Sequence, residues 1–158
     1  MPPTSLIGRA ATIDATGVKP GSLFGPGVLD RFEAAHGPVR EGDVVLFRTD
    51  RSRKWRVRPD SEGYLQDWPG VNRNLAEVLR DRRVRAVGTD SMSPDRCGSQ
   101  DYPIHYVLLP EQTMILENLA NLDRLPPFSL FLALPLKIRG GSGSPLRAIG
   151  FVPKTTDN

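Results

Sequence analysis

The residues best suited to chemistry in this 158-residue sequence are one histidine and one glutamate. His105 stands near the start of a short predicted helix, and Glu117 ends the strand predicted after it. The helix rises about 8 Å, the chain reverses at Pro110, and the strand returns about 16 Å. We therefore expect the two side chains to meet on one edge of the fold. An imidazole and a carboxylate suit zinc or manganese, although catalytic sites for these metals usually have three or more protein ligands.

The spacing also allows interpretations without a metal. His105 could be hydrogen-bonded locally while Glu117 pairs with an arginine, because lone residues of these types are seldom ligands. Cys97 is eight positions before His105, so a thiol–imidazole nucleophile pair is conceivable. Nothing near Cys97 in the sequence activates a thiol, which favours a bystander role. Its loop also contains acidic and hydroxyl residues that could bind substrate or metal, or simply form turns: Asp90, Ser91, Asp95 and Asp101.

A long polar stretch, residues 49–69, contains the remaining candidates. Tyr64 and Trp68 could line a pocket for an aryl substrate, or could pack over the loop itself. The densest positive charge in the chain surrounds Trp55, a composition compatible with nucleic-acid binding. A solvated loop, or one paired with carboxylates of a partner, is the preferred interpretation. The basic residues of this run are Arg48, Arg51, Arg53, Lys54, Arg56 and Arg58.

These residues need a framework, and the hydrophobic patterns predict one of alternating helices and strands. Predicted strands cover 6–14, 44–47, 84–90, 113–117, 128–138 and 146–152, and predicted helices cover 28–35, 73–82 and 104–109. Asn72 is the expected N-cap of the second helix. His36, just before Gly37, is expected at a helix end rather than in a metal site. The order of elements predicts an α/β fold with a mixed sheet and flanking helices.

Composition limits the class of protein further. At 17.4 kDa, with 39% hydrophobic and 25% charged residues, the chain is expected to form one domain over 1–158, with 153–158 as a flexible tail. A single cysteine excludes an intramolecular disulfide framework. The sequence contains no apolar run long enough to cross a membrane and no pattern typical of a signal peptide, so we expect a cytoplasmic protein.

Several blocks along the chain resemble the cyclase family, also called kynurenine formamidase-like, which includes arylformamidases and isatin hydrolases. The resemblance extends over about residues 6–152. It implies a swivelling β/β/α fold and a divalent-metal hydrolase acting on formamide, amide, lactam or lactone bonds. His105 and Glu117 then fall where the family places two metal ligands. The blocks that carry it include Gly42–Asp50, Pro69–Val71, Val84–Ser93, Leu116–Asp123, Pro135–Ile138 and Gly143–Ala148.

One departure from the family is large. The family's string His-x-Gly-Thr-His-x-Asp-x-Pro-x-His supplies most metal ligands, and this chain has no such string and only two histidines, His36 and His105. We therefore expect an incomplete fold and an incomplete zinc or manganese site. A complementary chain carrying the string would complete the site. An apolar surface should remain where the missing segment packs, which favours a homo-oligomer or such a partner chain. The alternative is a non-catalytic binding or assembly subunit that retains the fold.

Overall fold

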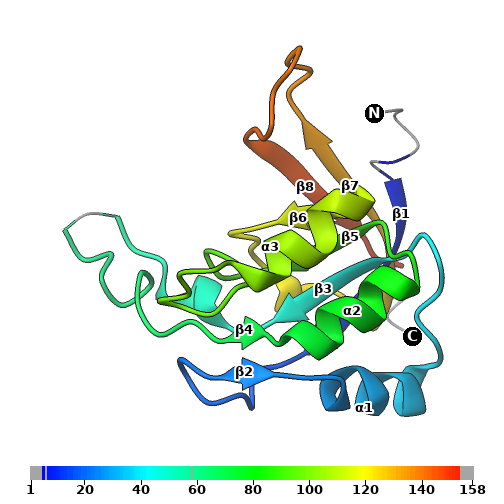
Figure 1. Cartoon of the computed structure of the whole chain (residues 1–158), viewed down its shortest axis with the longest axis horizontal. Helices are drawn as coiled ribbons and strands as arrows, with labels where there is room; N and C mark the ends of the chain where they lie inside the picture. Colours follow the sequence, from blue (N-terminus) through cyan, green and yellow to red (C-terminus); the bar gives the residue numbers. More distant parts are fainter. Residues whose placement is uncertain (1–4, 6, 58, 154–158) are drawn as a thin grey trace, which may run out of the picture.

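The computed structural model describes residues 5, 7–57 and 59–153, and its centre is a mixed six-stranded sheet (Figure 1). The strand order is β6-β5-β3-β1-β7-β8. The first four of these pair in parallel, whereas β7 runs antiparallel to β1 and to β8. The sheet strands are β1 (Ile7–Asp14), β3 (Val44–Arg48), β5 (Ala86–Thr89), β6 (Met114–Leu116), β7 (Phe128–Pro135) and β8 (Leu146–Phe151).

Shorter elements complete the framework. A parallel pair, β2 (Leu23–Phe24) and β4 (Gly70–Val71), was not expected from the sequence, because two-residue strands leave no hydrophobic period to recognise. The α-helices are α1 (Gly27–His36), α2 (Arg73–Asp81) and α3 (Pro103–Leu108), and the 3-10 helices are η2 (Arg51–Lys54), η3 (Leu109–Glu111) and η4 (Leu122–Arg124). None of the helices in the described ranges is long and apolar enough to cross a membrane.

Two hydrophobic cores lie on opposite faces of the sheet. In β3, Val45 and Phe47 face the cluster formed with the three α-helices, whereas Val44 and Leu46 face a second cluster formed with residues 116–125 and β7. Burial on both faces explains why this strand is continuously apolar. Gly88 in β5 allows the second layer to approach, because a Cβ there would lie 2.7 Å from Leu46 Cδ2 and 2.9 Å from Leu119 Cδ1.

The sequence predictions agree with this fold, with local differences. Asn72 caps α2, its Oδ1 accepting a 2.9 Å hydrogen bond from the Leu75 amide, and His36 is the last residue of α1. The strand predicted to reach residue 138 ends at Pro135, and Leu136 instead donates its amide to Ser144 Oγ within the hairpin connection. Predictions for Leu6, Arg58 and the tail after Pro153 fall outside the described residues.

Candidate metal-binding site

His105 lies in the first turns of α3, and a buried carboxylate fixes its position. Asp95, in the loop after β5, has a side chain only 2% exposed. Its Oδ1 accepts a 2.9 Å hydrogen bond from the Ile104 amide, and its Oδ2 lies 2.6 Å from His105 Nδ1. Because the carboxylate accepts, Nδ1 carries a proton and Nε2 is directed away from Asp95.

Glu117 follows β6 directly, at the end of the sheet where the parallel strands finish. The Asn118 amide donates to the Ser91 carbonyl at 2.9 Å, and the Leu119 amide donates to the Thr89 carbonyl at 3.1 Å. These bonds hold the segment after β6 beside the end of β5. As a result, Glu117 Oε1 lies 3.7 Å from His105 Nε2, and each side chain is about one third exposed.

The electrostatics of the pair follow from these contacts. The hydrogen bond to Asp95 raises the pKa of His105, against an opposing effect of burial. Burial raises the pKa of Glu117, and the nearby His105 acts in the opposite direction. The pair is therefore a partly desolvated carboxylate beside an imidazole that Asp95 orients.

The distances fit two ligands of one metal ion. Donor atoms bound tetrahedrally to zinc at about 2.1 Å are separated by roughly 3.4 Å, close to the 3.7 Å between Nε2 and Oε1. The donor chemistry suits zinc or manganese. Within the described ranges, however, no three His, Cys, Asp or Glu residues form a group that could hold a metal. Within that part of the chain, His105 and Glu117 are a pair of potential donors without a third beside them.

The two aromatic candidates of the long polar stretch form hydrogen bonds with residues beside this pair. Tyr64 is 3% exposed, and its hydroxyl donates a 2.7 Å hydrogen bond to Asn118 Oδ1, next to Glu117. Burial raises the pKa of Tyr64 to about 12, so the phenol stays protonated. Trp68 donates its indole N–H to the Asp95 carbonyl at 2.7 Å. Both side chains contact residues that position the donors.

Asp90 and Ser91, the polar substrate-binding candidates, are each 1% exposed and have partners within the chain. Asp90 Oδ1 accepts hydrogen bonds from the amide and hydroxyl of Thr49, at 2.8 and 2.6 Å. The Ser91 hydroxyl lies 2.8 Å from Thr89 Oγ1. Contact with a substrate would require these internal hydrogen bonds to open.

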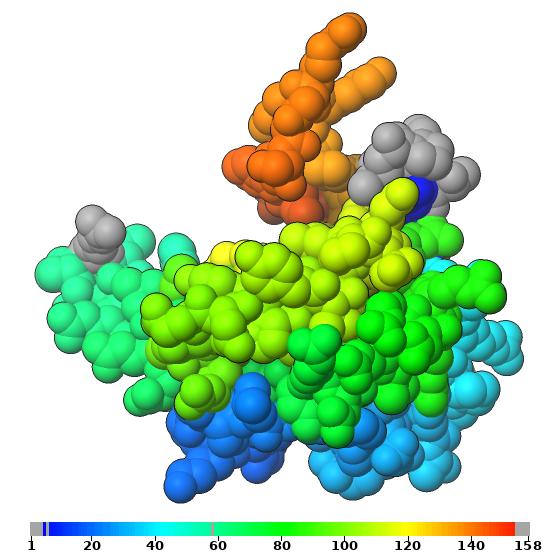
Figure 2. All heavy atoms as spheres, viewed as in Figure 1, coloured from blue at the N-terminus to red at the C-terminus, as the bar shows by residue number. Residues whose placement is uncertain are grey.

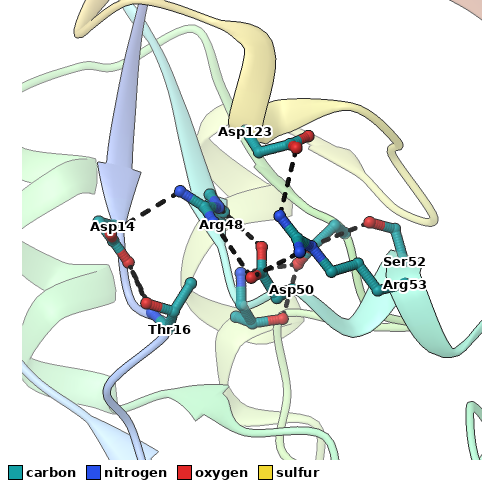
Figure 3. A network of polar contacts seen from close by, with 9 residues as sticks. Asp14, Thr16, Arg48, Asp50, Ser52, Arg53 and Asp123 are labelled. Atoms are coloured by element: carbon teal, nitrogen blue, oxygen red, sulfur yellow. Dashed lines mark hydrogen bonds and ion pairs between the residues drawn. The ribbon is translucent and has the colours of Figure 1, made fainter.

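Much of the basic run has a structural role. Arg51 is 5% exposed and donates to backbone carbonyls of the stretch, those of Gly63, Tyr64 and Gln66. Arg48 pairs with Asp50 at 2.7 Å and with Asp14 at 3.9 Å (Figure 3). Arg53 bridges Asp50 and Asp123, each at 3.3 Å, and so links η2 to η4 (Figure 3). These pairs partly neutralise the charge that suggested nucleic-acid binding.

Sequence reasoning gave no specific role to Asp95, Asn118 or Arg51. Asp95 was one acidic loop residue among several, and its ten-residue separation from His105 matches no motif. The sequence also gives no sign that Arg51, unlike its basic neighbours, is buried. Cys97 is a half-buried free thiol whose amide donates to the Trp68 carbonyl at 3.1 Å.

Comparison with known proteins identifies the family. Residues 1–96 match the model of the family described as "Putative cyclase". The chain is 31% identical to an isatin hydrolase of Roseibium aggregatum over 147 residues, covering 85% of this chain and 54% of that protein. It is 34% identical to a kynurenine formamidase of Salinibacter ruber over 158 residues, covering 94% of this chain and 65% of that protein. The chain belongs to this cyclase family.

Solved structures support the fold over nearly the whole chain. Isatin hydrolase A from Labrenzia aggregata, bound to benzyl benzoate, superposes with a TM-score of 0.85 at 31% identity, covering 95% of this chain and 62% of that one. A potential metal-dependent hydrolase with cyclase activity gives a TM-score of 0.74 at 26% identity, over 94% and 67% of the two chains. The chain thus spans roughly half to two thirds of the length of these relatives.

Proposed function

We propose that this chain is the part of a divalent-metal hydrolase that supplies His105 and Glu117 as ligands for zinc or manganese. The observation that carries the proposal is the convergence of His105 Nε2 and Glu117 Oε1 at 3.7 Å, with Nδ1 engaged by Asp95 at 2.6 Å. Relatives named isatin hydrolase and kynurenine formamidase support a small substrate with a lactam, amide, formamide or lactone bond. A single domain in a cytoplasmic setting remains part of this proposal.

The residues around His105 and Glu117 would each have a role in such a site. When bound, the metal supplies a Lewis acid that polarises a carbonyl and lowers the pKa of a water molecule. Asp95 keeps the Nδ1 proton in place, so that Nε2 offers its lone pair. Tyr64, through Asn118, and Trp68, through Asp95, tie the long polar stretch to residues beside Glu117 and His105. Asp90 and Ser91 brace the same end of the sheet and would reach a substrate only after rearrangement.

Zinc titration of the purified chain tests the ligand assignment. We expect weak one-to-one binding that falls at least tenfold in Glu117→Ala, because a two-ligand site loses half its donors. Glu111→Ala, an exposed glutamate in η3, is the matched control and should bind as the unchanged chain does. Equal binding by the two variants would refute the assignment.

Hydrolysis should require more than this chain. We expect little formamidase or lactonase turnover by the metal-loaded chain alone and substantial turnover when a family segment carrying the His-rich string is added. Rapid turnover by the isolated chain would contradict the proposed incompleteness. The second candidate, a non-catalytic assembly subunit, is favoured by the lack of a three-residue ligand group within the described ranges. It predicts no zinc binding and no turnover in either experiment.

A further inference from the structure

The β1, β7 and β8 side of the sheet presents apolar side chains on a face that the helices do not cover. In β7, Ser129, Phe131 and Ala133 are buried, so the alternating residues Leu130, Leu132 and Leu134 project to the opposite side. Leu130 and Leu134 are 49% and 42% exposed. This is the side on which the helices pack elsewhere, because Phe128 contacts Phe32 of α1 with ring centroids 5.3 Å apart.

Neighbouring strands extend the same face. The register places Ile7 of β1 and Ile149 of β8 beside Leu132, and Phe151 beside Leu130. Ile7, Ile149 and Phe151 are 42%, 37% and 52% exposed. Together the face exposes on the order of 400 Å² of apolar surface, a size at which the exposed patches of monomers are often functional. We call Ile7, Leu130, Leu132, Leu134, Ile149 and Phe151 the β1/β7/β8 face.

The shape of this region leaves room for another polypeptide segment to pack on the face. An open hollow of about 470 Å³ lies between Arg9, Phe128, Leu130 and Phe151 on the face. β8 is the edge strand of the sheet, so its outer backbone groups lack a strand partner within the described sheet. The end of the hairpin that connects β7 to β8 projects from the rest of the molecule, as the orange region of Figure 2 shows.

We propose that the β1/β7/β8 face docks the polypeptide segment that the family relatives possess and this chain does not match. The isatin hydrolase structure covers 95% of this chain with the same fold, yet more than a third of its own chain has no counterpart here. A sheet buries its apolar face against another layer, so an apolar face without a layer is the surface suited to receive that unmatched part. The occupant is a segment of the cyclase family with a complementary apolar face.

A binding experiment tests this directly. The probe is the segment of the Salinibacter ruber kynurenine formamidase that has no counterpart in this chain, purified on a soluble carrier and titrated in EDTA. We expect saturable binding that weakens at least tenfold in Leu130→Asp. Leu109→Asp is the matched control, since Leu109 in η3 is 50% exposed but lies outside the face. Circular dichroism melting verifies that both variants fold.

Each result decides the question. Loss of binding in Leu130→Asp alone supports the docking face. Failure of the unchanged chain to bind, or equal binding by both variants, overturns it. A dimer of the chain that depends on Leu130 and excludes the segment also overturns it, because the occupant would then be a second copy. Since EDTA removes metal, docking can fail while zinc binding succeeds, and the reverse, so this inference and the proposed function are tested separately.

Discussion

Replacing Asp95 by asparagine tests the central geometry of the candidate site. The change keeps the shape of a side chain that is 2% exposed, but it removes the charge that faces His105 Nδ1 at 2.6 Å. The carbonyl oxygen of the new side chain can still accept from the Ile104 amide, whereas its NH₂ group would face Nδ1. The imidazole is then driven to carry its proton on Nε2, which blocks the nitrogen directed toward Glu117.

The magnitude follows from how such residues act on metal ligands. Loss of a carboxylate that orients a ligating histidine lowers metal affinity about 10- to 100-fold. We therefore expect the zinc dissociation constant of Asp95→Asn to rise by that factor. The free energy of unfolding should also fall by about 1.5–3 kcal/mol, because a hydrogen bond to a buried charged group is lost.

Two measurements separate the local effect from a general one. Zinc titration gives the affinity, and nitrogen-15 NMR of the His105 ring reports which nitrogen is protonated in the metal-free chain. Asp101→Asn, an exposed acid in the same loop, should change neither. Unchanged zinc affinity in Asp95→Asn, or an Nδ1-protonated ring in that variant, would refute the reasoning.

Three further predictions concern the framework. Gly88→Ala should lower the free energy of unfolding by about 1–3 kcal/mol in urea titrations, because its methyl group would meet Leu46 and Leu119. Gly63→Ala, with open space around it, is the control. Equal stabilities of the two variants would contradict the packing. Arg51→Met should expose residues 59–69 to limited proteolysis, because the guanidinium donates to three carbonyls there, whereas Arg56→Met, at an exposed position, should leave the digestion unchanged. Burial would raise the pKa of Glu33, but hydrogen bonds from Arg82 and the Val39 amide lower it below its usual 4.5. Its stabilising contribution is therefore complete above pH 4.5 and lost as the pH falls through the lower folded-state pKa. Glu33→Gln should lower the free energy of unfolding by about 1 kcal/mol at pH 7 and by progressively less in acid. A difference that does not depend on pH would exclude this linkage.

The sequence by itself determined the local elements and the family. The continuous apolar run of Val44–Phe47, the Asn72 cap and the stripe of Leu75 and Leu79 each encode an element within a few residues, so these predictions hold in the structure. The ordered blocks from Gly42–Asp50 to Gly143–Ala148 were sufficient to suggest the cyclase family, and the family model matches residues 1–96.

Only the tertiary structure decided what holds the site. Asp95, Asn118 and Arg51 act through contacts between segments distant in sequence or through backbone groups, and no spacing rule connects Asp95 to His105 or Tyr64 to Asn118. The sequence predicted that an apolar surface would remain, but its position depends on strand register and on where the helices stop covering the sheet. Periodicity shows which side of a strand is apolar, while neighbouring elements decide whether that side is covered.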